Sequence, residues 1–317
     1  MAKMLCCIAT IFIFAPKWKF MAEEIFNNEE VADEVQMLDP EDLQQKSHGD
    51  FPAFGDLVVM ILIIFGSQLV VTILSFLFGL TMPQSEMIDL VDLESYMRVE
   101  ILRGERFAVI YPMSMALAFG LLLLYVAKRD GKGVVARFSR KGFNPNIILF
   151  GLIWLVAAQI VLEPLLHLLP DVGDDGTGRG FWALMTAVLF APFFEELICR
   201  GIVLETLRRR WGKLLSVVMS ALLFAIIHLQ PATAITALVA GLIFGTIYLR
   251  TESLFSTIIL HALNNSIAYA LIAFGLDNVS FSQLFGGGMR YWIIYAVSVV
   301  ICLGIGFESY RKVYRKE

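Results

Sequence analysis

The chain of 317 residues is 58% hydrophobic and 17% charged, with a mean hydropathy of +0.72. Soluble domains average about 45–50% apolar and about 25% charged residues, so the composition excludes an ordinary soluble domain. The net charge is −4, and the basic residues cluster beside the apolar runs as topology signals, so no Lys/Arg-rich patch suggests a nucleic-acid partner. The apolar residues form long runs, which predicts an all-α, polytopic membrane helix bundle in contact with membrane lipids.

Residues 1–50 are expected to form a cytoplasmic extension. The apolar run Met4–Ala15 is shorter than the about 20 residues that a spanning helix needs. Basic residues follow it without a clear cleavage site, so we interpret it as an interfacial segment rather than a signal peptide. Ten acidic residues and one lysine between Met21 and Asp50 predict a solvated linker. The membrane-embedded domain is expected to occupy residues 51–317.

About eight transmembrane helices are predicted in this domain, with an interfacial helix in the polar connection 84–106. If they alternate, the basic segments at 128–141, 208–213, Arg250 and 311–316 all fall on one side, together with both termini. The excess of Lys and Arg predicts that this side is cytoplasmic. The predicted spans are Leu57–Leu80, Phe107–Ala127, Ile147–Leu169, Phe181–Arg210, Leu214–Leu229, Ala232–Leu249, Leu254–Leu276 and Tyr291–Phe307.

The fourth predicted span carries Glu195, Glu196 and Arg200 in an otherwise apolar stretch. A charge near a bilayer centre costs about 2.5–3.5 kcal/mol on insertion scales, so three charges within six residues indicate a functional site. In an α-helix Glu196 and Arg200 share a face and can pair as structural support. Glu195 points about 100° away, which makes it the candidate general base.

The fifth and seventh predicted spans contain further polar residues. His228 lies one helical turn after Phe224, and it is either a buried core histidine or part of the site. His261 and Asn265 lie one turn apart on a common face. They can either stabilise an oxyanion or form hydrogen bonds between helices. In the sixth span, Gly241-x-x-x-Gly245 predicts close helix packing.

The sequence also allows other chemistries to be considered for these spans. Glu195, His228 and His261 suit zinc as ligands, although no HExxH motif is present. A serine nucleophile is not supported, because no GxSxG motif occurs. Glu163 and His167 near the end of the third span are interpreted as an interfacial polar pair, with a second metal or proton site as the alternative.

The ordered motifs Glu195-Glu196-x-x-x-Arg200, Phe224-x-x-x-His228 and His261-x-x-x-Asn265 resemble the CPBP family, which comprises CAAX prenyl proteases and bacterial Abi proteins. The resemblance covers roughly Phe181–Ala270 and implies an intramembrane endopeptidase of eight helices. It implies that Glu195 and His228 activate a water, and that His261 and Asn265 stabilise the oxyanion. It further implies a membrane-associated or lipidated protein or peptide substrate and no cofactor, with zinc as the alternative.

Two functions from other classes stay open at this point. The same buried polar residues can pack a non-catalytic membrane scaffold or a bacteriocin-immunity-type protein. Buried Glu and His side chains also serve proton or ion relays in transporters. The sequence shows no internal repeat of the kind from which many transporters are built, which disfavours a transporter.

Overall fold

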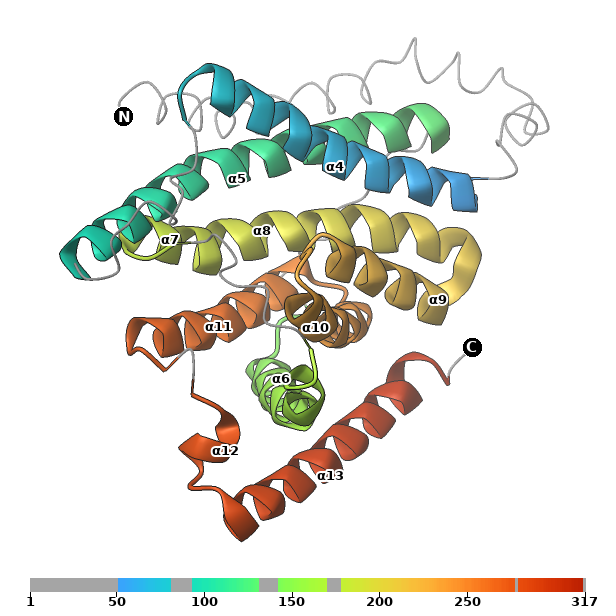
Figure 1. Cartoon of the computed structure of the whole chain (residues 1–317). Helices are drawn as coiled ribbons and strands as arrows, with labels where there is room; N and C mark the ends of the chain where they lie inside the picture. Colours follow the sequence, from blue (N-terminus) through green and yellow to red (C-terminus); the bar gives the residue numbers. More distant parts are fainter. Residues whose placement is uncertain (1–50, 81–92, 131–141, 170–177, 277–278, 316–317) are drawn as a thin grey trace. The chain divides into compact units, whose positions relative to one another are not determined.

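The computed structural model describes residues 51–80, 93–130, 142–169, 178–276 and 279–315 (Figure 1). Every regular element in these ranges is a helix, which confirms the predicted all-α membrane bundle. The predicted extension 1–50, with its apolar run Met4–Ala15, lies outside the described residues. The division of the chain near residue 50 therefore stays a prediction.

Six helices in the described part of the chain are long and apolar enough to cross a membrane. They correspond to the first three and the last three predicted spans, so the protein is an integral, multi-pass membrane protein. A short helix, α12 (Phe281–Leu284), precedes the last of them. The six are α4 (Phe54–Leu77), α5 (Leu93–Asp130), α6 (Pro145–Leu166), α10 (Pro231–Thr251), α11 (Leu254–Ala273) and α13 (Gly288–Val313).

The prediction of a separate interfacial helix in 84–106 is wrong for the described part of that segment. Residues 93–106 belong to α5, which runs on without a break into the second predicted span. Ion pairs one turn apart support helical structure in this polar stretch, because Glu94 lies 2.9 Å from Arg98 and Glu100 lies 3.1 Å from Arg103. The remaining residues, 84–92, are outside the described ranges.

The fourth and fifth predicted spans are present as helical segments between Phe181 and Ile226. Gly212 interrupts α9 with φ 73° and ψ 176°, which glycine adopts without strain, and this break separates the two spans. The junctions before it have right-handed helical backbone angles, so the segments up to Gly212 form one continuous rod. The segments are α7 (Phe181–Met185), η2 (Thr186–Phe190), α8 (Ala191–Glu196), η3 (Leu197–Leu204) and α9 (Glu205–Ile226).

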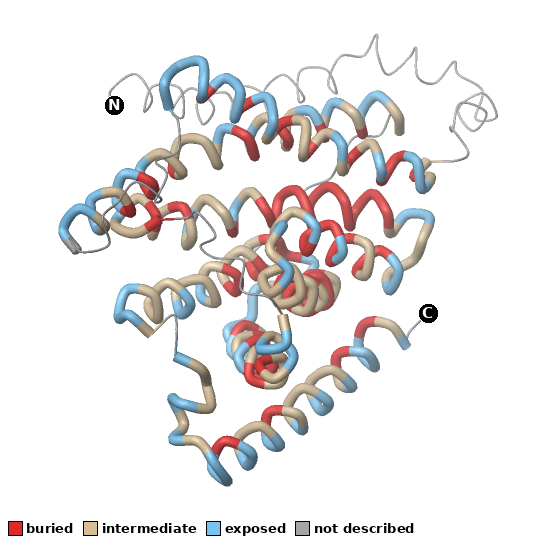
Figure 2. Tube along the Cα trace, viewed as in Figure 1, coloured by how far each residue is buried: buried red, intermediate tan, exposed pale blue. Residues whose placement is uncertain are grey.

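Two of these segments, η2 and η3, are π-helical, with hydrogen bonds from residue i to i+5. Pro192 at the start of α8 has no backbone N–H, which removes one α-helical hydrogen bond just where η2 ends. All eight residues of η3 are buried, and Figure 2 shows this rod as the most continuously buried part of the bundle. The helix that carries the charged motif is thus the centre of the fold.

Contacts at one end of the bundle join the described parts of the predicted basic segments. Trp211 donates a hydrogen bond to the carbonyl of Pro52, which lies just before α4. The segment just before α6 and the end of α10 also meet here, since a Cβ on Gly142 would collide with the backbone of Thr251. This shared end agrees with the predicted alternation of spans. The further contacts are Arg129 with Asp56 (2.9 Å), Arg209 with Asp130, and Lys213 with the carbonyl of Val313 (3.4 Å).

Helix α10 packs closely against α9 through its two glycines. A Cβ on Gly241 would lie 2.9 Å from Cα of Ala221, and a Cβ on Gly245 would lie 3.0 Å from Cγ1 of Val217. The small-xxx-small packing predicted from the sequence is therefore present. It brings α10 against the helix that ends near His228.

Candidate active site

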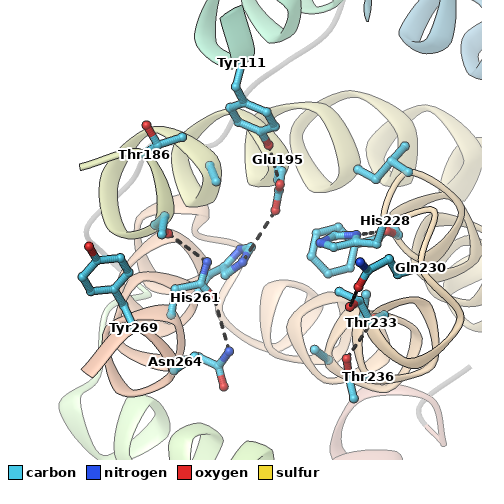
Figure 3. A pocket seen from close by; sticks show the side chains of 18 of the residues that line it. Tyr111, Thr186, Glu195, His228, Gln230, Thr233, Thr236, His261, Asn264 and Tyr269 are labelled. Atoms are coloured by element: carbon cyan, nitrogen blue, oxygen red, sulfur yellow. Dashed lines mark hydrogen bonds and ion pairs between the residues drawn. The ribbon is translucent and has the colours of Figure 1, made fainter. Parts of the chain in front are cut away.

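A cavity of about 910 Å³ lies among α4, α5, α6, the rod from η2 to α8, α9, α10 and α11. Glu195, His228, His261 and Asn265 all line it, although they come from three different predicted spans. Figure 3 shows Glu195 and His261 joined on one part of the wall and His228 on another. The structure thus brings the four predicted site residues to one space.

Glu195 lies at the cavity wall between the phenol of Tyr111 and the imidazole of His261. The hydroxyl of Tyr111 on α5 donates a hydrogen bond to Oε1 of Glu195 (Figure 3). The other oxygen, Oε2, lies 3.6 Å from Nε2 of His261. Only 6% of Glu195 is exposed, so these two neighbours largely define its polar surroundings.

Glu196 and Arg200 form the ion pair that their spacing predicts. Oε1 of Glu196 lies 2.9 Å from Nη1 of Arg200, and both side chains are fully buried. Arg200 also donates from Nη2 to the carbonyl of Gly241 at 3.1 Å. Its guanidinium carbon lies 4.8 Å from the ring centre of Phe224 and 5.3 Å from that of Phe244, which adds cation–π attraction. The pair therefore ties η3 to α9 and α10.

His261 directs both ring nitrogens toward glutamates. Nδ1 lies 3.0 Å from Oε1 of Glu196, and Nε2 faces Glu195. The ring stacks on Phe244 with centroids 4.7 Å apart and meets Phe224 edge-on at 5.6 Å. These contacts fix the orientation of the imidazole. The spacing of His261 and Asn265 did not reveal this bridge to both glutamates.

His228 lies just beyond the end of α9, in contact with the residue one turn before it. Its Nδ1 is 2.6 Å from the carbonyl oxygen of Phe224, and the two rings meet edge-on at 4.8 Å. A carbonyl oxygen only accepts, so Nδ1 carries the proton and Nε2 is the basic nitrogen. In the view of Figure 3, Glu195 lies between His228 and His261.

Asn265 forms an interhelical hydrogen bond with η2. Its Nδ2 donates to the carbonyl oxygen of Ala187 at 2.9 Å. The N–H of Ala191, the α-helical partner of that carbonyl, bonds to Thr186 instead, and Pro192, the π-helical partner, has no N–H. The amide of Asn265 therefore satisfies a carbonyl that the helix leaves open, and among the described residues its nitrogen has this one acceptor.

Tyr111 is the site residue that the sequence motifs did not identify. It comes from the second predicted span, far from the charged motif in sequence, and it lines the cavity. A polar hydroxyl near the start of an apolar span was the only available signal. Tyrosine is common in such spans, so this signal does not single it out.

The candidate zinc ligands do not form a ligand set as the side chains stand. Within the described ranges, no group of three His, Cys, Asp or Glu residues is arranged to hold a metal ion. Each ring nitrogen of His261 faces a glutamate, and Nδ1 of His228 bonds to the carbonyl oxygen of Phe224.

Glu163 and His167 lie at the carboxyl end of α6, and Glu163 contacts α12. Oε1 of Glu163 accepts hydrogen bonds from the backbone N–H groups of Phe281 and, at 3.4 Å, Ser282. Nε2 of His167 is 3.8 Å from the same oxygen, and 64% of its side chain is exposed. Glu163 therefore anchors α12, and the interfacial position of the pair stays a prediction.

Comparison with known families identifies the central part of the chain. A family model described as type II CAAX prenyl endopeptidase Rce1-like matches residues 177–267. The match confirms the predicted resemblance to CAAX proteases, and all three sequence motifs lie inside it. It covers less than a third of the 317 residues and excludes α4, α5, α6 and α13. Searches among curated proteins and solved structures found no match.

Proposed function

Starting from the match of residues 177–267 to type II CAAX prenyl endopeptidases, we propose that this protein is an intramembrane endopeptidase. It would hydrolyse peptide bonds of membrane-associated or lipidated proteins. The observation that carries the proposal is the buried carboxylate of Glu195, which accepts a hydrogen bond from Tyr111 and faces His261, in a cavity that His228 also lines. A carboxylate and an imidazole around a space for substrate are the elements of general acid–base hydrolysis.

In the proposed reaction Glu195 removes a proton from a water molecule, and Nε2 of His228 accepts a hydrogen bond from the same water. The water oxygen attacks the carbonyl carbon of the peptide bond and forms a tetrahedral oxyanion. Glu195 then delivers its proton to the leaving nitrogen as the C–N bond breaks. A positioned acid–base group of this kind contributes about 10²–10⁴-fold to the rate.

His261 and Asn265 are proposed to stabilise the oxyanion. His261 is oriented by Glu196 at Nδ1, and its Nε2 lies at the cavity wall near Glu195, where it can face the oxyanion. Asn265 contributes the N–H that is not bonded to Ala187. Removing one such donor typically lowers kcat by about 10²–10³-fold. Glu196 and Arg200 support this arrangement without contact with the substrate.

The proposed chemistry needs no metal or other cofactor, because Glu195 and His228 supply the proton acceptors. The proposed partners are membrane lipids and a membrane-associated protein or peptide substrate. The shared end of the basic segments is proposed to be cytoplasmic, together with both termini, since Lys and Arg are enriched on that side of membrane proteins.

The test is cleavage of membrane-anchored peptides by the full chain in proteoliposomes. Glu195→Gln keeps the size and polarity of the side chain but removes the proton acceptor, so we expect kcat to fall at least about 100-fold. Glu105→Gln, at an exposed position of α5, is the matched control and should retain wild-type activity. Unchanged cleavage by Glu195→Gln would overturn the proposal.

A non-catalytic scaffold or immunity protein is the second candidate. The observation that favours it is the bond between Asn265 and Ala187, which together with the Arg200 contacts locks several helices. Such a protein would keep its full biological effect in both Glu195→Gln and His228→Ala. An endopeptidase would lose its effect in both.

A further inference from the structure

We propose that Tyr111 is the positioning residue for Glu195, an inference that rests on the proposed function. Tyr111 lies on α5, outside the residues 177–267 that match the endopeptidase family. The geometry assigns it the task of holding one oxygen of the carboxylate so that the other faces the reacting groups. The site would then consist of the matched segment and one residue from the earlier part of the chain.

The contact between the two side chains is direct. The Tyr111 hydroxyl donates to Oε1 of Glu195, while Oε2 faces Nε2 of His261 at 3.6 Å. The hydrogen bond at Oε1 fixes the plane of the carboxylate, whereas a carboxylate without it can rotate about its last torsion. Tyr111 thereby determines which oxygen of Glu195 is presented to the water.

Tyr111 is itself well supported. Its ring lies 5.2 Å from that of Phe107, one turn earlier on α5. The hydroxyl of Ser114 donates to the backbone carbonyl of Tyr111 at 2.8 Å. Helix α5 also packs against η2, α8 and η3, so the phenol is carried by an element already docked on the rod that holds Glu195. A rigid carrier is what a positioning residue requires.

The hydrogen bond also has an electrostatic consequence. A bond donated to a carboxylate is charge-assisted, and it is stronger in a cavity of low polarity than in water. The phenol has no role in proton transfer in the proposed steps. Its loss should therefore affect the chemical step more than substrate binding.

The test compares Tyr111→Phe with Tyr125→Phe in the full chain, reconstituted in nanodiscs. Tyr125 lies on the same helix but does not line the cavity, and its hydroxyl donates to the carboxylate of Asp56 at 2.6 Å. For Tyr111→Phe we expect kcat to fall about tenfold or more with KM little changed, as expected for a hydrogen bond to a charged group. Tyr125→Phe should keep the wild-type kcat.

An infrared measurement tests the contact without relying on activity. The difference spectrum between wild type and Glu195→Gln identifies the carboxylate stretching bands of Glu195. Tyr111→Phe should shift these bands and Tyr125→Phe should not. Bands that stay in place in Tyr111→Phe would overturn the inference.

The outcomes separate the two proposals. If Glu195→Gln is inactive and Tyr111→Phe keeps the wild-type kcat, only the role of Tyr111 is overturned. If Glu195→Gln cleaves like wild type, the proposed function fails and the positioning role fails with it. A selective loss of kcat in Tyr111→Phe, together with shifted bands, supports both.

Discussion

Nδ1 of His261 lies 3.0 Å from Oε1 of Glu196, the same oxygen that Arg200 contacts at 2.9 Å. Glu196 is therefore not only the counter-charge of Arg200, as its spacing suggested. It also orients the imidazole that faces Glu195. One buried carboxylate oxygen thus connects the structural ion pair with the proposed reacting groups.

The first prediction concerns the stability of this pair. Glu196→Gln leaves Arg200 fully buried without its counter-charge, and breaking such a pair typically costs about 3–5 kcal/mol. Glu94→Gln removes one partner of the exposed pair with Arg98 and should cost at most about 1 kcal/mol. The free energy of unfolding, measured for both variants in the same bicelles, checks this difference. Equal losses would contradict the structural role of Glu196.

The second prediction distinguishes two histidines near helix ends. His228 lines the cavity, so His228→Ala should lower kcat by about 10²-fold or more in the peptide cleavage assay. His167 is largely exposed at the end of α6, and His167→Ala should leave kcat unchanged. A His228→Ala variant with wild-type kcat would remove His228 from the proposed mechanism.

The third prediction concerns helix packing at two glycines. Gly241→Ala places a methyl group 2.9 Å from Cα of Ala221, and overpacking of this kind costs about 1–3 kcal/mol. The variant should also weaken the bond from Arg200 to the Gly241 carbonyl. Gly66→Ala, on α4, meets no atom within 4 Å and should be neutral or slightly stabilising. Thermal unfolding of the two variants checks the sign of each change.

The fourth prediction concerns metal dependence. Because Glu195 and His228 supply the proposed proton acceptors, cleavage should be unchanged after dialysis against EDTA and 1,10-phenanthroline. A soluble zinc protease, treated in parallel, provides the control for effective metal removal. Loss of cleavage that returns when zinc is added would favour the alternative site at Glu195, His228 and His261 over the proposed mechanism.

The helical fold was largely predictable because apolar runs and breakers mark the spans. The start of α11 at Leu254 agrees with the predicted boundary, and α10 differs from its prediction by one residue at its start and two at its end. The extension of α5 through residues 93–106 was not predicted as part of a span. Its charged residues indicate a segment exposed to water. Its helical structure follows instead from local ion pairs and from continuity with the apolar segment.

The sequence predicted most of the residues that line the site but only some of the contacts between them. Helical spacing identified the Glu196–Arg200 pair, because both residues lie on one helix. The bridge from His261 to both glutamates and the bond from Tyr111 join different helices, so they depend on how those helices pack. The π-helical register of η2 also follows from packing and from Pro192, and it explains why Asn265 bonds to Ala187.

The Tyr111 contact has a consequence for how this protein can be divided or recombined. A fragment limited to residues 177–267 would retain every family motif but would lack the phenol that contacts Glu195. If the proposed function holds, transplanting that fragment into another membrane scaffold should require a host helix with a hydroxyl donor at the matching depth. The unit that must be inherited together then includes α5 as well as the motifs.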